Sequence, residues 1–288
     1  MSKSMRRSAF GIVLAALLAF SLCFLSACGS SSSSSDNAAT PTSTTPGTIQ
    51  IFAANSLQKA LPLVQALYTQ QHPDVKFADT QFKGSGDLVS ELQGGAKADL
   101  LICASESSMD TANTNGSIEA NTRKDMFTND LVIAEKTGAG YKINSLKDVE
   151  SAKYAKIAIG QGAAVPAGAY ANQALNTIGL YSAADGKTGS YSADFASKVV
   201  QDSSVGNVAQ HVQSGDCQIG FVYTSDIYRY PGIQVAYKVP ANTHKAIVYP
   251  GAVCTGSVNA QASQDFLNFC LTNAQAQKIW SEYGFAVK

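Results

Sequence analysis

The chain has 288 residues with 21 Lys+Arg and 21 Asp+Glu, so its formal net charge is zero. The first 27 residues carry three of the cations and no acid, and without them 18 basic residues face 21 acidic ones, a net charge of −3. A mildly acidic chain without a basic cluster is a poor candidate for nucleic-acid binding, and any anion that it holds must be held by local geometry.

Residues 1–27 have the form of a signal peptide. Three basic residues precede an apolar run over residues 12–24, which is the order of charge and hydrophobicity found in secretory signals. The run ends at residues 25–28 (Leu-Ser-Ala-Cys), which have the form of a lipobox. A plain secretory signal with a chance cysteine is the alternative. We predict a lipid on Cys28, and therefore an extracytoplasmic lipoprotein anchored to the cell membrane.

Residues 28–47 are predicted to be the lipidated cysteine followed by a disordered tether. After Cys28 the segment is Ser, Thr, Pro, Asn and Ala with almost no large apolar side chains, so it buries too little surface to offset the entropy of ordering. No later segment reaches the roughly 20 apolar residues needed to span a bilayer. The soluble body therefore begins near residue 48.

The body of about 240 residues is long enough for two domains. Hydrophobic periodicity predicts strands alternating with helices, which indicates an α/β fold. The first elements are strands at 48–54, 75–82 and 98–104 and helices at 57–71, 88–93 and 109–115. The next are strands at 130–134, 156–160 and 219–223, an extended run at 195–200, and helices at 146–149, 167–178 and 205–214. The last are strands at 233–239 and 246–253 and helices at 260–271 and 274–283.

This order predicts two lobes, each a mostly parallel sheet flanked by helices, with a ligand cleft between them. We place lobe 1 at residues 48–128 plus 240–288 and lobe 2 at residues 129–239. In open α/β sheets the ligand lies beyond the carboxyl ends of the strands, where helices begin. The junctions between strands and helices are therefore the candidate site.

Five residues at these junctions are candidate ligands. Ser56 follows the first strand, and Ser85 lies between two glycines that allow close approach of the backbone. Ala167 and Val205 lie at the starts of helices, and Tyr223 ends its strand. Helix N-termini leave unpaired N–H groups and a partial positive charge, so several of them aimed at one point bind an anion without cations. Taken singly, each serine is more often a helix cap, and a strand tyrosine is more often a packing residue.

Several segments of the body resemble the molybdate-binding proteins of ABC importers, within the two-lobed type II periplasmic-binding-protein family. They lie in family order and span nearly all of residues 48–288. The matching segments are residues 51–57 (Ile-Phe-Ala-Ala-Asn-Ser-Leu), 95–99 (Gly-Ala-Lys-Ala-Asp), 158–160 (Ala-Ile-Gly), 165–171 (Val-Pro-Ala-Gly-Ala-Tyr-Ala), 220–226 (Gly-Phe-Val-Tyr-Thr-Ser-Asp), 247–250 (Ile-Val-Tyr-Pro) and 283–285 (Tyr-Gly-Phe).

The resemblance implies a binding protein rather than an enzyme, which acts as a monomer without a cofactor and delivers molybdate or tungstate to an ABC permease. It implies that the oxyanion accepts hydrogen bonds from Ser56 and Ser85, from the amides of Ala167 and Val205, and from the hydroxyl of Tyr223. Molybdenum would be bound only as the oxyanion, with no metal-ion site.

The sequence departs from the family pattern in three places. Asn55 stands where Ala or Ser is common, Gly84 and Gly86 flank Ser85 where serines are frequent, and Gln161 replaces a frequent Asp. These departures leave the class of ligand in place and make its identity the weaker part of the prediction.

Two alternatives remain. A binding protein of the same fold could carry sulfate or another small oxyanion, because sulfate shares the charge and shape of molybdate. An exported serine hydrolase is the other alternative, although no G-x-S-x-G elbow occurs and the three histidines have no assignable partner. Neither the histidines nor the cysteines have metal-ligand spacing. The four cysteines of the body, Cys103, Cys217, Cys254 and Cys270, could be paired or free.

Overall fold

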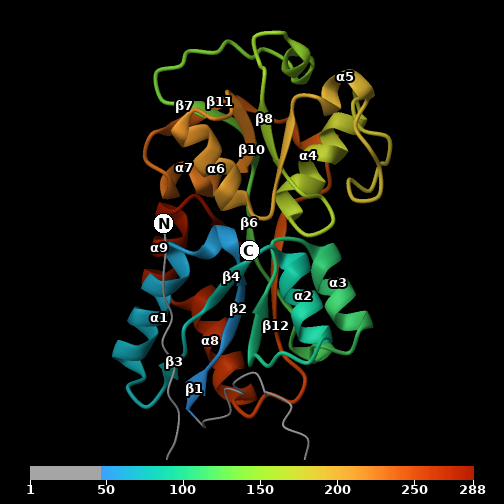
Figure 1. Cartoon of the computed structure of the whole chain (residues 1–288). Coiled ribbons are helices and arrows are strands. Elements are labelled where there is room, and N and C mark those ends of the chain that lie inside the picture. Colours follow the sequence, from blue (N-terminus) through green and yellow to red (C-terminus); the bar gives the residue numbers. More distant parts are fainter. Residues whose placement is uncertain (1–46) are drawn as a thin grey trace, which may run out of the picture. The chain divides into compact units, whose positions relative to one another are not determined.

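The computed structural model describes residues 47–288. The predicted signal peptide, Cys28 and the tether up to residue 46 lie outside the described residues. Within the described part, two mixed sheets flanked by helices form the two lobes of a type II periplasmic-binding-protein fold (Figure 1). A two-stranded sheet of β1 (Thr48–Ile49) and β3 (Lys76–Phe77) accompanies them.

Lobe 1 is built on a six-stranded sheet. Its strands, in order across the sheet, are β13 (Ala286–Val287), β6 (Lys124–Thr128), β12 (Val248–Val253), β5 (Leu100–Ile102), β2 (Ile51–Ala54) and β4 (Gln81–Lys83). Its helices are α1 (Ala60–Gln71), α2 (Ser85–Gln93), α3 (Glu106–Thr114), α8 (Ala260–Thr272) and α9 (Ala274–Glu282), with short 3₁₀ turns η1 (Asn55–Leu57) and η2 (Ala120–Thr122).

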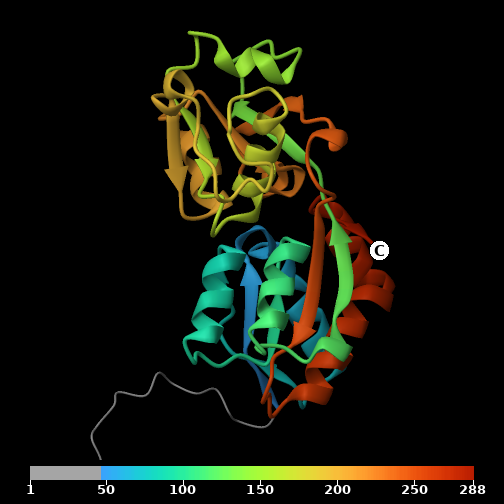
Figure 2. The same cartoon turned by 90° about the vertical axis from the view of Figure 1, so that its right-hand side faces the viewer.

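The two faces of this sheet are covered by different helices, as Figures 1 and 2 show. Alternate residues of β2 point to opposite faces, as the period of a strand requires. Phe52 packs with Leu88 of α2 and Met109 of α3, whereas Ile51 belongs to the core that contains Leu61 of α1, with α8 and α9. Both faces of β2 are therefore buried, and the strand is held firmly within the sheet.

Lobe 2 is built on a five-stranded sheet. Its strands, in order, are β11 (Ile233–Lys238), β7 (Leu131–Lys136), β10 (Ile219–Tyr223), β8 (Ile157–Gly160) and β9 (Val199–Asp202). Helices α4 (Pro166–Asn176) and α6 (Val205–Ser214) lie on its opposite faces (Figure 1). The remaining helical segments are η3 (Leu146–Glu150), α5 (Ala193–Ala196), α7 (Thr224–Arg229) and η4 (Ala241–Thr243).

Most strands of each sheet run in one direction, as predicted, and each sheet also contains antiparallel pairs. In lobe 1, β4, β2 and β5 pair in parallel and β12, β6 and β13 add antiparallel ladders. In lobe 2, β9, β8 and β10 are parallel and β7 and β11 are antiparallel. β12 and β13 in lobe 1 and β7 in lobe 2 run against the other strands of their sheets.

Several predicted elements differ from the structure. The helix predicted from residue 57 begins at Ala60, after the 3₁₀ turn η1. The strand predicted at 75–82 is two strands, because β3 pairs with β1 and β4 pairs with β2. The extended run predicted at 195–200 begins as helix α5, in which Phe195 is buried. The helix at 205–214 and the strand at 219–223 are confirmed.

The four cysteines of the body are buried and free of disulfides. Burial raises the pKa of the Cys103 thiol to about 12 and that of Cys217 to about 11. Thiols with such pKa values carry little thiolate at neutral pH and are chemically inert. The cysteines therefore act as small hydrophobic residues of the core.

Candidate functional site

The predicted junctions meet in one pocket between the carboxyl ends of the parallel strands. β2, β4 and β5 end on its lobe 1 side, and β8, β9 and β10 end on its lobe 2 side. The pocket has a volume of about 210 Å³, which includes space open to solvent. It is lined by Ala54, Asn55, Ser56, Lys83, Gly84, Ser85, Ala104, Val165, Pro166, Ala167, Val205 and Tyr223. All five residues predicted from the sequence are in this lining, and their role as ligands stays a prediction.

Three helices begin at the pocket. Gly84 precedes α2, Val165 precedes α4 with Pro166 in its first turn, and Ser204 caps α6 by accepting a hydrogen bond from the Asn207 N–H at 3.1 Å. Proline suits the first turn because its missing N–H would have no partner there. The local sequence thus sets where each helix starts.

The first amides of these helices have no acceptor within residues 47–288. Neither Ser85, Ala167 nor Val205 donates its backbone N–H to another group of the described chain. Such N–H groups at helix starts are orphan donors that water or a ligand must satisfy. They carry the positive end of the helix dipole into the pocket, so the lining favours an anion.

The serine hydroxyls are oriented by neighbours. Ser85 Oγ accepts a hydrogen bond from the Ala104 N–H at 3.0 Å, which leaves its own proton free to donate. Ser56 Oγ and Tyr249 Oη lie 2.9 Å apart, and Asn129 Nδ2 donates to Tyr249 Oη at 3.5 Å. With Asn129 donating to Tyr249 and Tyr249 donating to Ser56, the Ser56 proton is also free for the pocket.

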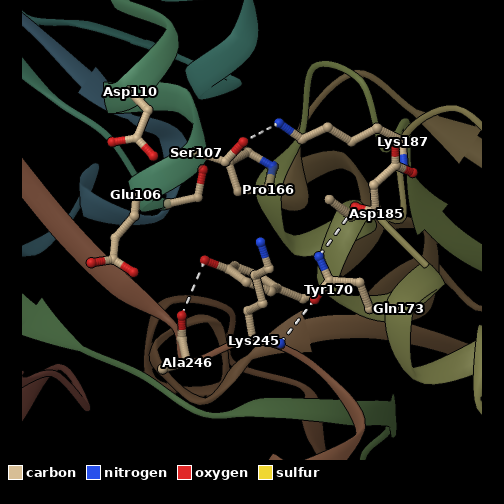
Figure 3. Close-up of a pocket in the computed structure, with 12 residues that line it drawn as sticks. Glu106, Ser107, Asp110, Pro166, Tyr170, Gln173, Asp185, Lys187, Lys245 and Ala246 are labelled. Carbon is tan, nitrogen blue, oxygen red and sulfur yellow. Dashed lines mark hydrogen bonds between the residues drawn. The ribbon is translucent and has the colours of Figure 1, made fainter. Parts of the chain in front are cut away.

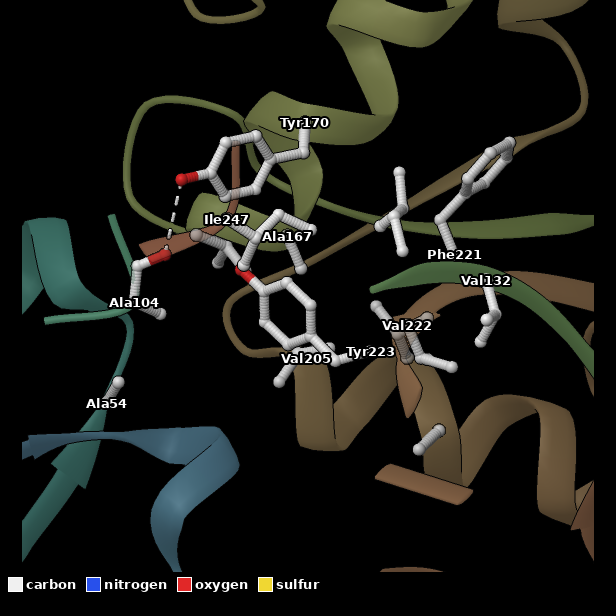
Figure 4. Packing of buried hydrophobic residues seen from close by; sticks show 14 of the residues in the cluster. Ala54, Ala104, Val132, Ala167, Tyr170, Val205, Phe221, Val222, Tyr223 and Ile247 are labelled. Carbon is white, nitrogen blue, oxygen red and sulfur yellow. Dashed lines mark hydrogen bonds between the residues drawn. The ribbon is translucent and has the colours of Figure 1, made fainter. Parts of the chain in front are cut away.

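Tyr223 carries a buried hydroxyl with no hydrogen-bond partner among the described residues. Its side chain is 1% exposed, and burial, followed by the nearby Tyr249, raises its pKa well above the ordinary value. The phenol therefore remains a neutral donor. Figure 4 shows the ring between Ala167 of α4 and Val205 of α6. A buried unpaired hydroxyl is costly, so this group gains most from an acceptor placed in the pocket.

Cations contribute little to the pocket. Lys83 is the cation of the lining, and its ammonium is paired with Glu91 of α2. Arg229 lies outside the lining and is paired with Asp226 at 2.9 Å. The pocket is therefore lined mainly by neutral donors, as the sequence predicted.

A larger hollow adjoins the pocket and shares Pro166 with it (Figure 3). It has a volume of about 720 Å³, which includes space open to solvent. Glu106, Asp110 and Asp185 line it together with Lys187 and Lys245. Lys187 Nζ donates to Ser107 Oγ at 2.7 Å, and burial lowers its pKa. Charges of both signs compete there, so this larger space is the poorer site for an anion.

No histidine of the described chain lines the pocket. His72 stacks on Tyr68 with ring centroids 4.2 Å apart, His211 lies near Asp202 and Cys217, and His244 packs against Tyr170. Ser56 and Ser85 therefore have no imidazole that could act as a base toward them. Across residues 47–288, no group of three or more His, Cys, Asp and Glu is placed to hold a metal ion.

Sequence reasoning missed four residues that organise the pocket: Ala104, Asn129, Tyr249 and Arg229. Ala104 and Asn129 follow strands at the same edges as the predicted ligands, so the rule on carboxyl ends could have included Ala104. Tyr249 lies in a segment that matched the family, but its contact with Ser56 joins residues 193 positions apart in the chain. No sequence pattern reports such a contact.

Comparison with known proteins places the chain in a family. The model of the family described as bacterial extracellular solute-binding protein matches residues 49–286. The chain therefore belongs to this family, whose members bind solutes. It is 28% identical to YvgL of Bacillus subtilis, assigned as an ABC transporter substrate-binding lipoprotein, over 97% of this chain and 98% of that protein.

Two further relatives are molybdate-binding proteins by name. The chain is 30% identical to the molybdate-binding protein ModA of Escherichia coli, over 84% of this chain and 90% of that protein. The periplasmic molybdate-binding protein of Azotobacter vinelandii superimposes with a TM-score of 0.70 at 18% identity, over 83% of this chain and 99% of that one. The second likeness shows the fold. Within residues 47–288, no helix combines the length and the apolar character needed to cross a membrane.

Proposed function

We propose that this protein captures molybdate or tungstate in the pocket between its lobes and delivers it to an ABC permease. The oxyanion accepts hydrogen bonds from Ser56 and Ser85, from the amides of Ala167 and Val205, and from the hydroxyl of Tyr223. The observation that carries the proposal is the convergence of these five donors in one pocket. The similarity to a protein named as molybdate-binding, which extends over most of the chain, supports it.

Neutral donors suit a cargo that has to be released. Hydrogen bonds to a charged group are worth about 1.5–3 kcal/mol each, so five of them hold a dianion without a salt bridge. The donors sit on rigid helix starts and strand ends, so the pocket selects by shape and size. The same donors also fit sulfate, which makes sulfate the alternative cargo.

Binding involves closure of two lobes about a hinge. In this proposal lobe 1 comprises residues 48–128 and 240–288, lobe 2 comprises residues 129–239, and the closed form presents a surface to the permease. X-ray scattering should report a smaller radius of gyration with molybdate than without it. Identical profiles would contradict the closure step.

The N-terminal cysteine anchors the protein to the outer face of the membrane in this proposal, and the protein acts as a monomer. The lipobox at residues 25–28 supports the anchor, as does the assignment of YvgL as a lipoprotein. Replacement of Cys28 by alanine should move the protein from the membrane fraction to the soluble fraction. Retention of the variant in the membrane would contradict the anchor.

Isothermal titration calorimetry with a panel of oxyanions tests the cargo. We expect one molybdate or tungstate bound per chain and little heat from sulfate or phosphate at equal concentrations. A thermal-shift series with the same anions provides a second readout, because a ligand stabilises only the state that it binds. A response to sulfate equal to that to molybdate would contradict the selectivity for molybdate and favour the alternative cargo. The absence of a response to any oxyanion would overturn the proposal.

A further inference from the structure

Asn55 joins the two lobes directly beside the pocket. Its side-chain oxygen accepts hydrogen bonds from the Gly206 N–H at 3.1 Å and from Arg229 Nη2 at 3.0 Å, and its backbone carbonyl accepts from Arg229 Nη1. Asn55 follows β2 in lobe 1, whereas Gly206 and Arg229 lie on α6 and α7 of lobe 2. One residue therefore makes three bonds across the cleft.

Arg229 is a buried cation that depends on these bonds. Its side chain is 2% exposed and that of Asp226 is 0% exposed. The two are at ion-pair distance, yet Asp226 Oδ1 takes no hydrogen bond of good geometry and Arg229 Nε has no partner within the described chain. A buried ion pair is stable only when its remaining hydrogen-bonding groups are satisfied. The oxygens of Asn55 are thus the acceptors that complete the guanidinium.

Gly206 leaves the room that Asn55 needs. An ideal Cβ at this position would lie 2.6 Å from Asn55 Oδ1, 2.7 Å from Tyr230 Oη and 3.1 Å from Arg229 Nη2. Any larger residue would push Asn55 away from the first turn of α6. Asn55, Gly206 and Arg229 therefore form a matched set, in which the absence of a side chain at Gly206 makes room for the Asn55 oxygen.

The neighbour of Gly206 is Val205, whose N–H faces the pocket without a partner among the described residues. Because Asn55 holds the very next amide, it fixes how the first turn of α6 is aimed. On the other side of the pocket, the Gly86 N–H donates to the Ala164 carbonyl at 2.9 Å. Hydrogen bonds thus bridge the cleft on both sides of the site. The bridge to α6 is made by the side chain of Asn55, whereas the other is made by backbone groups alone.

We propose that Asn55 and Arg229 are positioning residues of the anion site. Arg229 donates hydrogen bonds to both oxygens of Asn55, and Asn55 accepts one from the Gly206 N–H. These bonds direct the neighbouring Val205 N–H at the ligand and keep the lobes closed. Neither side chain has to touch the oxyanion for this role. The inference rests on the proposed function of the same pocket.

Asn55→Ala tests the inference, because alanine removes the side-chain acceptor and creates no clash. We expect molybdate affinity to fall by at least about 30-fold, the lower bound for two lost hydrogen bonds of which one is to a charged group. The loss should lie in a faster dissociation rate, measured by stopped flow, because interface changes act mostly on dissociation. Gly206→Ala, which displaces Asn55, should weaken binding to a similar degree.

A spectroscopic readout separates positioning from general damage. In protein labelled with ¹⁵N at valine and alanine, saturating molybdate should shift the amide resonances of both Val205 and Ala167 in the wild type. In Asn55→Ala the shift of Val205 should shrink while that of Ala167 persists, because α4 does not contact Asn55 through any hydrogen bond of the described chain.

The outcomes distinguish the inference from the function on which it rests. Absence of molybdate binding in the wild type overturns the proposed function. Wild-type binding with unchanged affinity and an unchanged Val205 shift in both Asn55→Ala and Gly206→Ala overturns the positioning role alone. Arg229→Lys, which keeps a cation beside Asp226 and loses the planar fork of donors, should fall between the wild type and Asn55→Ala.

Discussion

The two walls of the pocket supply donors of different kinds. Lobe 1 supplies the side-chain hydroxyls of Ser56 and Ser85, which are held by Tyr249 and by the Ala104 amide, together with one helix-start N–H, that of Ser85. Lobe 2 supplies the backbone N–H groups of Ala167 and Val205, together with the one buried hydroxyl of Tyr223. The first wall depends mainly on which side chains are present, and the second depends mainly on where helices begin.

This difference predicts how each wall responds to mutation. A hydroxyl is removed by a single change of side chain, whereas a backbone donor survives every substitution except proline. Lobe 2 should therefore tolerate changes at Ala167 and Val205 that preserve the helix starts. Four substitutions, ordered by expected effect, test the comparison.

Tyr223→Phe should have the largest effect. The hydroxyl is buried without a partner among the described residues, so ligand binding both forms a hydrogen bond and relieves an unsatisfied group. We expect a loss of about 3 kcal/mol in molybdate affinity by calorimetry. Without ligand, the variant should melt at the wild-type temperature or a few degrees above it. A variant that melts lower and binds normally would make Tyr223 a packing residue.

Val205→Pro should weaken binding by about 2 kcal/mol, because it deletes the N–H and leaves the rest of the helix start intact. Proline is favoured at the first helical position, and Ser204 has φ −152° and ψ 155°, values compatible with a following proline. Val205→Ala, which keeps the N–H, is the matched control and should bind nearly as the wild type does. Equal affinities of the two variants would remove this amide from the site.

Ser85→Ala should cost about 1–2 kcal/mol of affinity, since it removes one donor to a charged ligand. The effect is smaller than at Tyr223 because the Ser85 hydroxyl already has a partner in the Ala104 amide. Calorimetry at one temperature measures it, and Ser90→Ala, on the exposed face of the same helix, serves as the control. Unchanged affinity would make Ser85 a structural residue of α2.

Lys83→Gln should have the smallest effect, below about 0.5 kcal/mol, because exposed ion pairs contribute little. The side chain of Lys83 is 43% exposed, and its ammonium is paired with Glu91. For the same reason, affinity should change little between low and high salt. A loss as large as that of Tyr223→Phe would show that the site relies on a cation, against the comparison of two neutral walls.

Much of the fold followed from local patterns in the sequence. The helix over Val205–Ser214 was predicted from its apolar spacing, and in the structure it ends at Gly215, which has a φ of 91°. The strand Ile219–Tyr223 was predicted from a short apolar run between polar segments. These features depend on residues within a few positions of one another, so local physical chemistry is sufficient to place them.

The pairing of strands could not be obtained in this way. β12 lies between β5 and β6 and is antiparallel to both, although it is far from them in sequence. A strand has the same alternation of side chains in either direction, so its pattern does not reveal the direction of its neighbours. The sequence therefore did not show which strands run against the others.

The sequence by itself determined which residues can donate hydrogen bonds at the ends of the strands, because serine, tyrosine and helix starts can be recognised from a few neighbouring residues. Only the tertiary structure decided that Tyr249 orients Ser56, that Tyr223 lacks a partner among the described residues, and that Asn55 meets Arg229. The Asn55–Arg229 contact joins residues 174 positions apart. Contacts at such separations exist only once the two sheets have packed and brought their carboxyl ends to one cleft.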